Sequence, residues 1–107
     1  MNLKELTAQG RRNYIETFAE MLEEAMPEII RRCEEAASKG KTSTKVDFVD
    51  IFPGSTYNHA VDVTYRFSND PKFLETMSSA CLSLEKVGGR LSFELGPMYR
   101  VCVSWDE

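Results

Sequence analysis

The sequence predicts an α+β domain spanning residues 1–107, in which four short strands form a mainly antiparallel sheet with two helices on one face. Two long stretches carry apolar residues at helical spacing, and each leads through glycine to two stretches of alternating apolar residues. The last stretch of each set is similar: "AVDVTY" at 60–65 and "YRVCVSW" at 99–105. We therefore expect the order α-β-β-α-β-β, produced by an internal αββ duplication.

The first helix is predicted over residues 14–37. Its apolar residues recur every three or four positions and form one stripe on a helical wheel. Pro27 interrupts this pattern without shifting its phase and falls on the opposite side, so we expect a bend rather than two helices. Gly40 supplies the end of the helix.

The first pair of strands is predicted over residues 42–52 and 57–67. In the first strand the alternation slips by one residue near Val49, which favours a bulge there. The segment "PGS" at 53–55 has the residue types of a turn. In the second strand Val61, Val63 and Tyr65 share one face, which we expect to point into the core.

The second half of the chain is predicted to repeat this arrangement. Asp70 is a candidate N-cap directly before Pro71, and helical spacing continues to Val87, ahead of a glycine pair. Strands over 91–95 and 99–105 then flank a Gly-Pro turn. We expect Trp105 to lie on the apolar face of the last strand.

Composition and charge exclude several classes of function. The net charge of -4 opposes binding to nucleic acid, and no apolar run reaches the roughly 20 residues of a membrane span. The first ten residues lack the apolar core of a signal peptide. Three cysteines without close spacing are typical of reduced thiols, so we expect a cytoplasmic protein.

No motif in the sequence predicts catalysis. Cys33, Cys81, Cys102 and His59 do not have the spacing of a zinc site, and the two glycines at 88–89 end a helix instead of opening a phosphate-binding one. Cys33 and Cys81 fall on apolar stripes and are expected in the core, whereas Cys102 points outward and is reactive only if its pKa is lowered. We expect a protein without catalytic residues, metal or cofactor.

Two surfaces are candidates for binding. Glu16, Glu20, Glu23 and Glu34 gather on the polar side of the first helix, where like charges repel one another and could meet a basic partner. The open face of the sheet carries Cys102 among few charges, which favours a homodimer through that face. An alternative is a pocket between sheet and helices that binds a small ligand or nucleotide.

The alternative pocket would be lined by Tyr57, His59 and Arg66, since they stand at the entrance and end of the second predicted strand. His59 is the only histidine and has no nucleophile motif beside it, so its expected role is in ligand contact or loop structure. Binding at this pocket and binding of a protein partner stay open as alternatives.

Three segments carry a resemblance to a known group of proteins. "AASKGKTSTKV" at 36–46, "LEKVGGRLSF" at 84–93 and "YRVCVSW" at 99–105 resemble small uncharacterised accessory proteins of tailed bacteriophages. This resemblance implies a non-enzymatic phage protein that acts in the bacterial host cell, as an inhibitor of a host or antiviral-defence protein by stoichiometric binding. It transfers no site residues to this chain.

Overall fold

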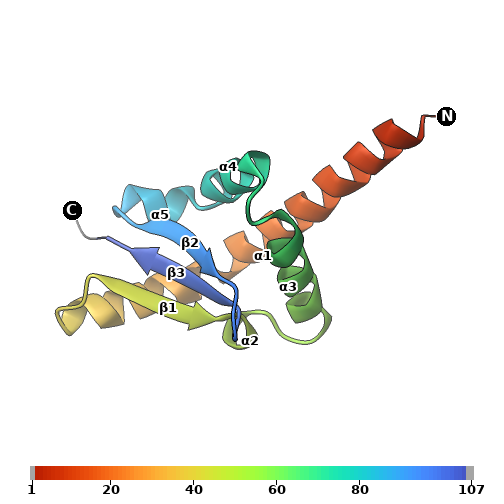
Figure 1. The fold of residues 1–107 in the computed structure, drawn as a ribbon. Helices are drawn as coiled ribbons and strands as arrows, with labels where there is room; N and C mark the ends of the chain where they lie inside the picture. Colours follow the sequence, from red (N-terminus) through yellow and green to blue (C-terminus); the bar gives the residue numbers. More distant parts are fainter. Residues whose placement is uncertain (1, 106–107) are drawn as a thin grey trace.

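The computed structural model describes residues 2–105 and has a three-stranded antiparallel sheet packed against one long helix (Figure 1). The elements are α1 (Leu3–Ser38), β1 (Ser43–Asp47), α2 (Phe48–Ile51), α3 (Ser55–Phe67), α4 (Pro71–Ala80), α5 (Leu82–Lys86), β2 (Arg90–Glu94) and β3 (Arg100–Ser104). The strand order is β1-β3-β2, so β1 and β2 are the edges. Most of the described chain is helical, and the predicted four-stranded sheet with two helices is wrong.

Helix α1 follows the predicted apolar stripe. The side chain of Asn2 caps its first turn by accepting a hydrogen bond of 2.9 Å from the Lys4 N–H. The helix runs on through Pro27, whose side chain is exposed as expected. Gly40 adopts a φ of 80° just after the helix, which confirms the predicted stop. The N-terminal turns of α1 project beyond the rest of the fold (Figure 1), and Leu3 there is 74% exposed.

The predicted strand over residues 57–67 is wrong, because this segment is the helix α3. Its alternation of Val61, Asp62 and Val63 has the period of a strand, but Ala60, Val63, Thr64 and Phe67 also have helical spacing. The helix buries Ala60, Val63 and Thr64 on one face against α1 and the core. In a short segment that satisfies both periods, packing against the remaining elements selects the structure.

Strand β1 ends earlier than predicted. The slip in alternation near Val49 marks the short helix α2 and not a bulge. This turn of helix places Phe48 and Phe52 on the same side, with ring centroids 5.2 Å apart and both rings buried, while Val49 is exposed.

The C-terminal hairpin and the N-cap of the helix before it form as the sequence predicts, but that helix is divided in two. Asp70 caps α4 by accepting a hydrogen bond of 2.9 Å from the Lys72 N–H, directly before Pro71. The predicted helix is divided at Cys81, where ψ is 33°, into α4 and α5. Strands β2 and β3 then pair antiparallel, with Ser92 opposite Cys102.

The predicted duplication is also wrong. The first half of the chain contains α1, β1, α2 and α3, whereas the second contains α4, α5, β2 and β3. The segments "AVDVTY" and "YRVCVSW" therefore form a helix and a strand, respectively. Tyr65, which was expected to point into the core, is 72% exposed, whereas Trp105 is partly buried against the core.

The core is aromatic and centres on Phe18 of α1. This fully buried ring lies within 6.2 Å, centroid to centroid, of four other phenylalanine rings. The four are Phe48, Phe52, Phe73 and Phe93. They come from α2 and its C-terminal end, from α4 and from β2, so one side chain of α1 contacts elements that are distant in sequence.

One buried polar group has no partner in the described part of the chain: the hydroxyl of Thr64, which is fully buried on α3. An unsatisfied buried hydroxyl destabilises the folded state, and valine replaces it by a methyl group of similar size. We expect Thr64→Val to raise the free energy of unfolding by about 1–2 kcal/mol, measured by urea denaturation.

Thr17→Val is the matched control for this substitution. The Thr17 hydroxyl is exposed and donates a hydrogen bond of 2.9 Å to the Asn13 carbonyl, so the change should be within about 0.5 kcal/mol of zero. A Thr64→Val variant that is no more stable than the wild type would show that the hydroxyl is satisfied in solution.

The described helices were also compared with the requirements of a membrane span. Across residues 2–105, none combines the length and the apolar character needed to cross a bilayer.

Candidate functional site

The four carboxylates predicted to bind a partner lie on one flank of α1, and we call them the acidic ridge: Glu16, Glu20, Glu23 and Glu34. All four are exposed, as the sequence predicts. At 3.6 residues per turn they fall within a narrow arc of the helix. None of the described residues forms an ion pair with any of them. The acidic ridge therefore presents four uncompensated negative charges.

This flank of α1 faces α4 and α5. Glu16 lines a shallow hollow together with Asp70 and Lys72 at the start of α4. Burial, and to a lesser extent the charge of Glu23, raises the pKa of the Cys81 thiol to about 11. The acidic ridge therefore lies beside α4 and the junction between α4 and α5.

At its C-terminal end the acidic ridge borders a cavity of about 200 Å³, which we call the apolar hollow. Glu34 is its one charged lining residue. The other lining residues come from α1, from α5 and the loop after it, and from the end of β3: Ile30, Cys33, Ala37, Leu84, Val87, Gly89, Val103 and Trp105. Val87 is 67% exposed at the rim. An open apolar cavity with an acidic margin can receive an apolar side chain from a basic surface.

The residues of the alternative ligand pocket, Tyr57, His59 and Arg66, all lie on α3. His59 donates from Nε2 to the Tyr14 carbonyl at 3.0 Å, and its ring meets the Tyr14 ring edge-on at 4.1 Å. The Tyr14 hydroxyl donates to Asp62 at 2.6 Å, which raises the tyrosine pKa, and Arg66 pairs with the same carboxylate at 3.2 Å. Tyr57 packs against the core instead. His59 and Arg66 therefore help to dock α3 on α1.

The cysteines are placed as the sequence predicts. Cys33 and Cys81 are buried in the core, and Cys102 is half-buried on the open face of the sheet. Burial and the nearby carboxylate of Glu94 raise the pKa of the Cys102 thiol, so it stays protonated at neutral pH. Within residues 2–105 no cluster of three histidine, cysteine or carboxylate side chains could hold a metal ion.

The open face of the sheet carries more charge than the sequence suggested. Lys45 pairs with Glu94 at 2.7 Å, and Asp47 with Arg100 at 2.7 Å. Arg100 also approaches Glu94 at 3.8 Å, which joins the three strands in one ion-pair network. Two such faces would have to desolvate these pairs in order to associate. The homodimer through this face stays a prediction.

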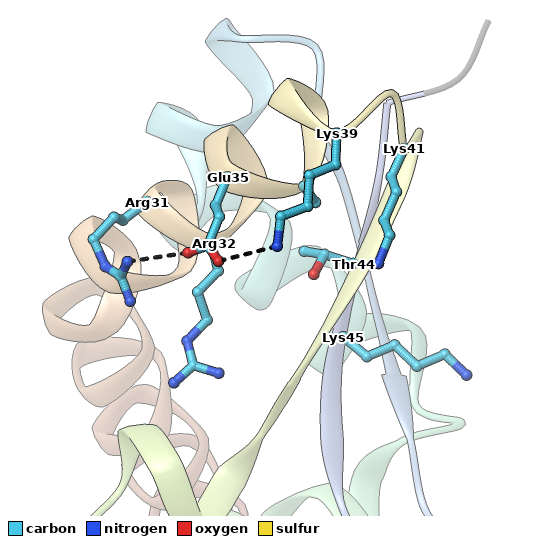
Figure 2. Close-up of a pocket in the computed structure, with 8 residues that line it drawn as sticks. Arg31, Arg32, Glu35, Lys39, Lys41, Thr44 and Lys45 are labelled. Atoms are coloured by element: carbon cyan, nitrogen blue, oxygen red, sulfur yellow. Dashed lines mark hydrogen bonds and ion pairs between the residues drawn. The ribbon is translucent and has the colours of Figure 1, made fainter.

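A second charged site lies on the opposite flank of α1, where the C-terminal end of the helix runs beside β1 (Figure 2). We call it the basic cleft; its volume is about 350 Å³. Its lining residues are Arg31, Arg32, Glu35, Ala36, Lys39, Lys41, Thr44 and Lys45. Five of the eight are basic, and Glu35 is the one carboxylate among them.

The ion pairs of the basic cleft are exposed. Arg31 and Arg32 both hydrogen-bond to Glu28, which lowers the pKa of that carboxyl to about 2. Glu35 lies 3.3 Å from Arg31 and 3.6 Å from Lys39 (Figure 2). Exposed pairs of this kind contribute little to stability and can exchange partners readily.

The sequence analysis missed the basic cleft. Arg32, Glu35 and Lys39 are spaced at three and four residues, which places them on one side of the helix. Lys41 and Lys45 join them only because the chain reverses at Gly40 and β1 packs along α1. The helical spacing was visible in the sequence, but the side on which β1 returns was not.

The chain was also compared with protein-family models, curated proteins and solved structures, and none of them matches.

Proposed function

We propose that this protein binds another protein stoichiometrically, without catalysis, through the acidic ridge and the apolar hollow. The observation that carries this proposal is their shared flank of α1: Glu34 lies about three turns after Glu23 on the same side of the helix and lines the open apolar cavity. Apolar anchors that fill cavities supply most of the binding energy in protein interfaces, and surrounding charges set the association rate and the choice of partner.

The partner that fits this surface is a protein with a basic face and a protruding apolar side chain. The basic face would meet the ridge, and the apolar side chain would enter the hollow beside Val87 and Trp105. The resemblance to phage accessory proteins makes a bacterial host or antiviral-defence protein the first class to test. Inhibition would follow if the ridge covered a basic surface that the partner needs for its own substrate.

Charge reversal tests the acidic ridge. The protein is immobilised, a partner is captured from bacterial lysate and identified, and its association with the purified protein is then measured at several salt concentrations. We expect Glu16→Lys/Glu20→Lys/Glu23→Lys to slow association by about tenfold or more at low salt, because steering by complementary charges acts mainly on the association rate. All three side chains are exposed, so the fold should be retained.

The matched control is Glu24→Lys/Glu75→Lys/Glu85→Lys. These carboxylates are also exposed, and none of the described residues forms an ion pair with them. The control therefore makes the same change in net charge outside the ridge and should slow association much less. Equal association rates for the two triple variants, or for the ridge variant and the wild type, would contradict the proposal.

A further inference from the structure

Strand β1 is an edge of the sheet, and its outer side is free in the described chain. The Trp105 N–H donates to the Thr42 carbonyl and the Phe48 N–H to the Tyr99 carbonyl, both at 3.0 Å. In an antiparallel pair such hydrogen-bonded positions recur at every second residue. Thr44 and Val46 therefore bond to β3, whereas Ser43 and Lys45 point their backbone N–H and C=O groups away from it. Asp47 likewise points its N–H outward, while its C=O, as the N-cap of α2, accepts the first hydrogen bond of that helix.

The basic cleft lies along this strand. Lys41, Thr44 and Lys45 line the β1 side of the cleft, and the flank of α1 with Lys39 lines the other, while the side chain of Lys45 points away from α1 toward the open face (Figure 2). The cavity of about 350 Å³ leaves room on the helix side of the strand. A strand added to β1 would have alternate side chains facing α1 and the open face, because side chains alternate along a strand.

The charges of the cleft select an acidic occupant. Lys41 has no carboxylate partner among the described residues, and Lys39 has only the 3.6 Å contact with Glu35. Both lie where side chains of an added strand would face α1. On the other face of the added strand, Lys45 would pair with an acidic side chain of the peptide and give up its exposed ion pair with Glu94.

We propose that the β1 edge and the basic cleft bind an extended acidic peptide segment of a partner protein, which adds to the sheet as a fourth strand. The free backbone groups favour a peptide over a nucleic acid, because phosphates would use the cations alone. The lysines favour a foreign strand over a second copy of β1, because Lys41 and Lys45 of the two copies would repel one another. This site is separate from the acidic ridge, so either can fail alone.

Synthetic peptides test the site without knowledge of the partner. The probe is a fluorescent peptide of about eight residues that repeats glutamate-glutamate-valine, so that carboxylates occur on both faces of the added strand, and it is long enough to run past β1. We expect it to bind, and the same peptide with lysine in place of glutamate not to bind. N-methylation of those alternate backbone nitrogens of the peptide that would face β1 keeps its charges but removes the N–H donors. This change should abolish binding, because the peptide can then no longer pair with β1.

Variants of the protein separate backbone pairing from charge. Lys45→Pro removes an outward N–H without removing any hydrogen bond between β1 and β3. We expect Lys45→Pro to bind the glutamate peptide about tenfold more weakly than Lys45→Ala, which also lacks the lysine charge but keeps the backbone N–H. Lys39→Glu/Lys41→Glu should weaken binding of the peptide by about tenfold or more. Lys4→Glu/Lys86→Glu makes the same change in net charge away from the cleft and should weaken binding much less.

Amide hydrogen exchange gives a direct readout. With the glutamate peptide bound, exchange at Ser43, Lys45 and Asp47 should slow, because their N–H groups become hydrogen-bonded. Three results would overturn the proposal: no binding of the glutamate peptide, equal binding of its N-methylated form, or no change in exchange at these amides. Binding of inorganic phosphate or an oligonucleotide in place of the peptide would assign the cleft to anions instead.

Discussion

Replacing Phe18 with alanine is expected to lower the free energy of unfolding by about 3–5 kcal/mol. The Phe18 ring is fully buried and stacks on Phe73 with an interplanar angle of 3° and a centroid distance of 6.1 Å. It also contacts three further phenylalanine rings, from α2, from its C-terminal end and from β2. Its removal leaves a cavity at the point where α1, the sheet and α4 meet. Urea denaturation followed by circular dichroism measures the effect.

The control for this prediction is Tyr65→Ala. Tyr65 is also aromatic, but it lies on α3 with 72% of its surface exposed, so its removal should change stability by no more than about 0.5 kcal/mol. The two variants also distinguish the observed fold from the one that the sequence suggested, in which Tyr65 fills the core. A large loss of stability for Tyr65→Ala would support the strand and contradict α3.

The elements predicted correctly are those with a long pattern or a definite signal at their ends. The stripe of α1 continues over many turns and Gly40 stands at its C-terminal end, although the helix begins at Leu3, eleven residues before the predicted start. The C-terminal hairpin has clean alternation between the glycines at 88–89 and the end of β3. In these segments local preference and tertiary packing agree, so the sequence is sufficient.

The segments predicted wrongly are short and satisfy two periods. In α3, Val61 and Val63 alternate as in a strand, while Ala60, Val63 and Thr64 form the face that the helix buries. The choice between the two depends on contacts with the rest of the fold. The Tyr14 carbonyl of α1 accepts a hydrogen bond from His59, and Val63 is buried in the hydrophobic core. Such contacts are made only after the chain has folded, and a local pattern does not contain them.

The candidate sites divide in the same way. The acidic ridge lies on one helix, so its exposure and arrangement followed from helical spacing alone. The apolar hollow requires α1, α5 and the end of β3 together, and the basic cleft requires the return of β1 along α1. Neither could be predicted from the sequence, because each combines residues whose proximity depends on tertiary structure.

The stability of the protein is expected to fall between about pH 9 and pH 11 through the ionisation of Cys81. Burial, together with the charge of Glu23, raises the pKa of this thiol from 9.0 to about 11 in the folded protein. In this window the unfolded state has lost the thiol proton while the folded state retains it. Rising pH therefore favours unfolding, and two pH units correspond to about 3 kcal/mol.

Cys81→Ala and Cys81→Ser isolate this contribution, because neither side chain titrates in this range. Tyr14 and Lys45, whose pKa values are also raised, contribute with the same sign but remain in both variants. The two variants will differ from each other at all pH values, since serine buries a hydroxyl where alanine does not. Urea denaturation at several pH values should nevertheless give both the same shallower decline above pH 9. A decline parallel to that of the wild type would show that the Cys81 thiol ionises in the folded protein as readily as in the unfolded chain.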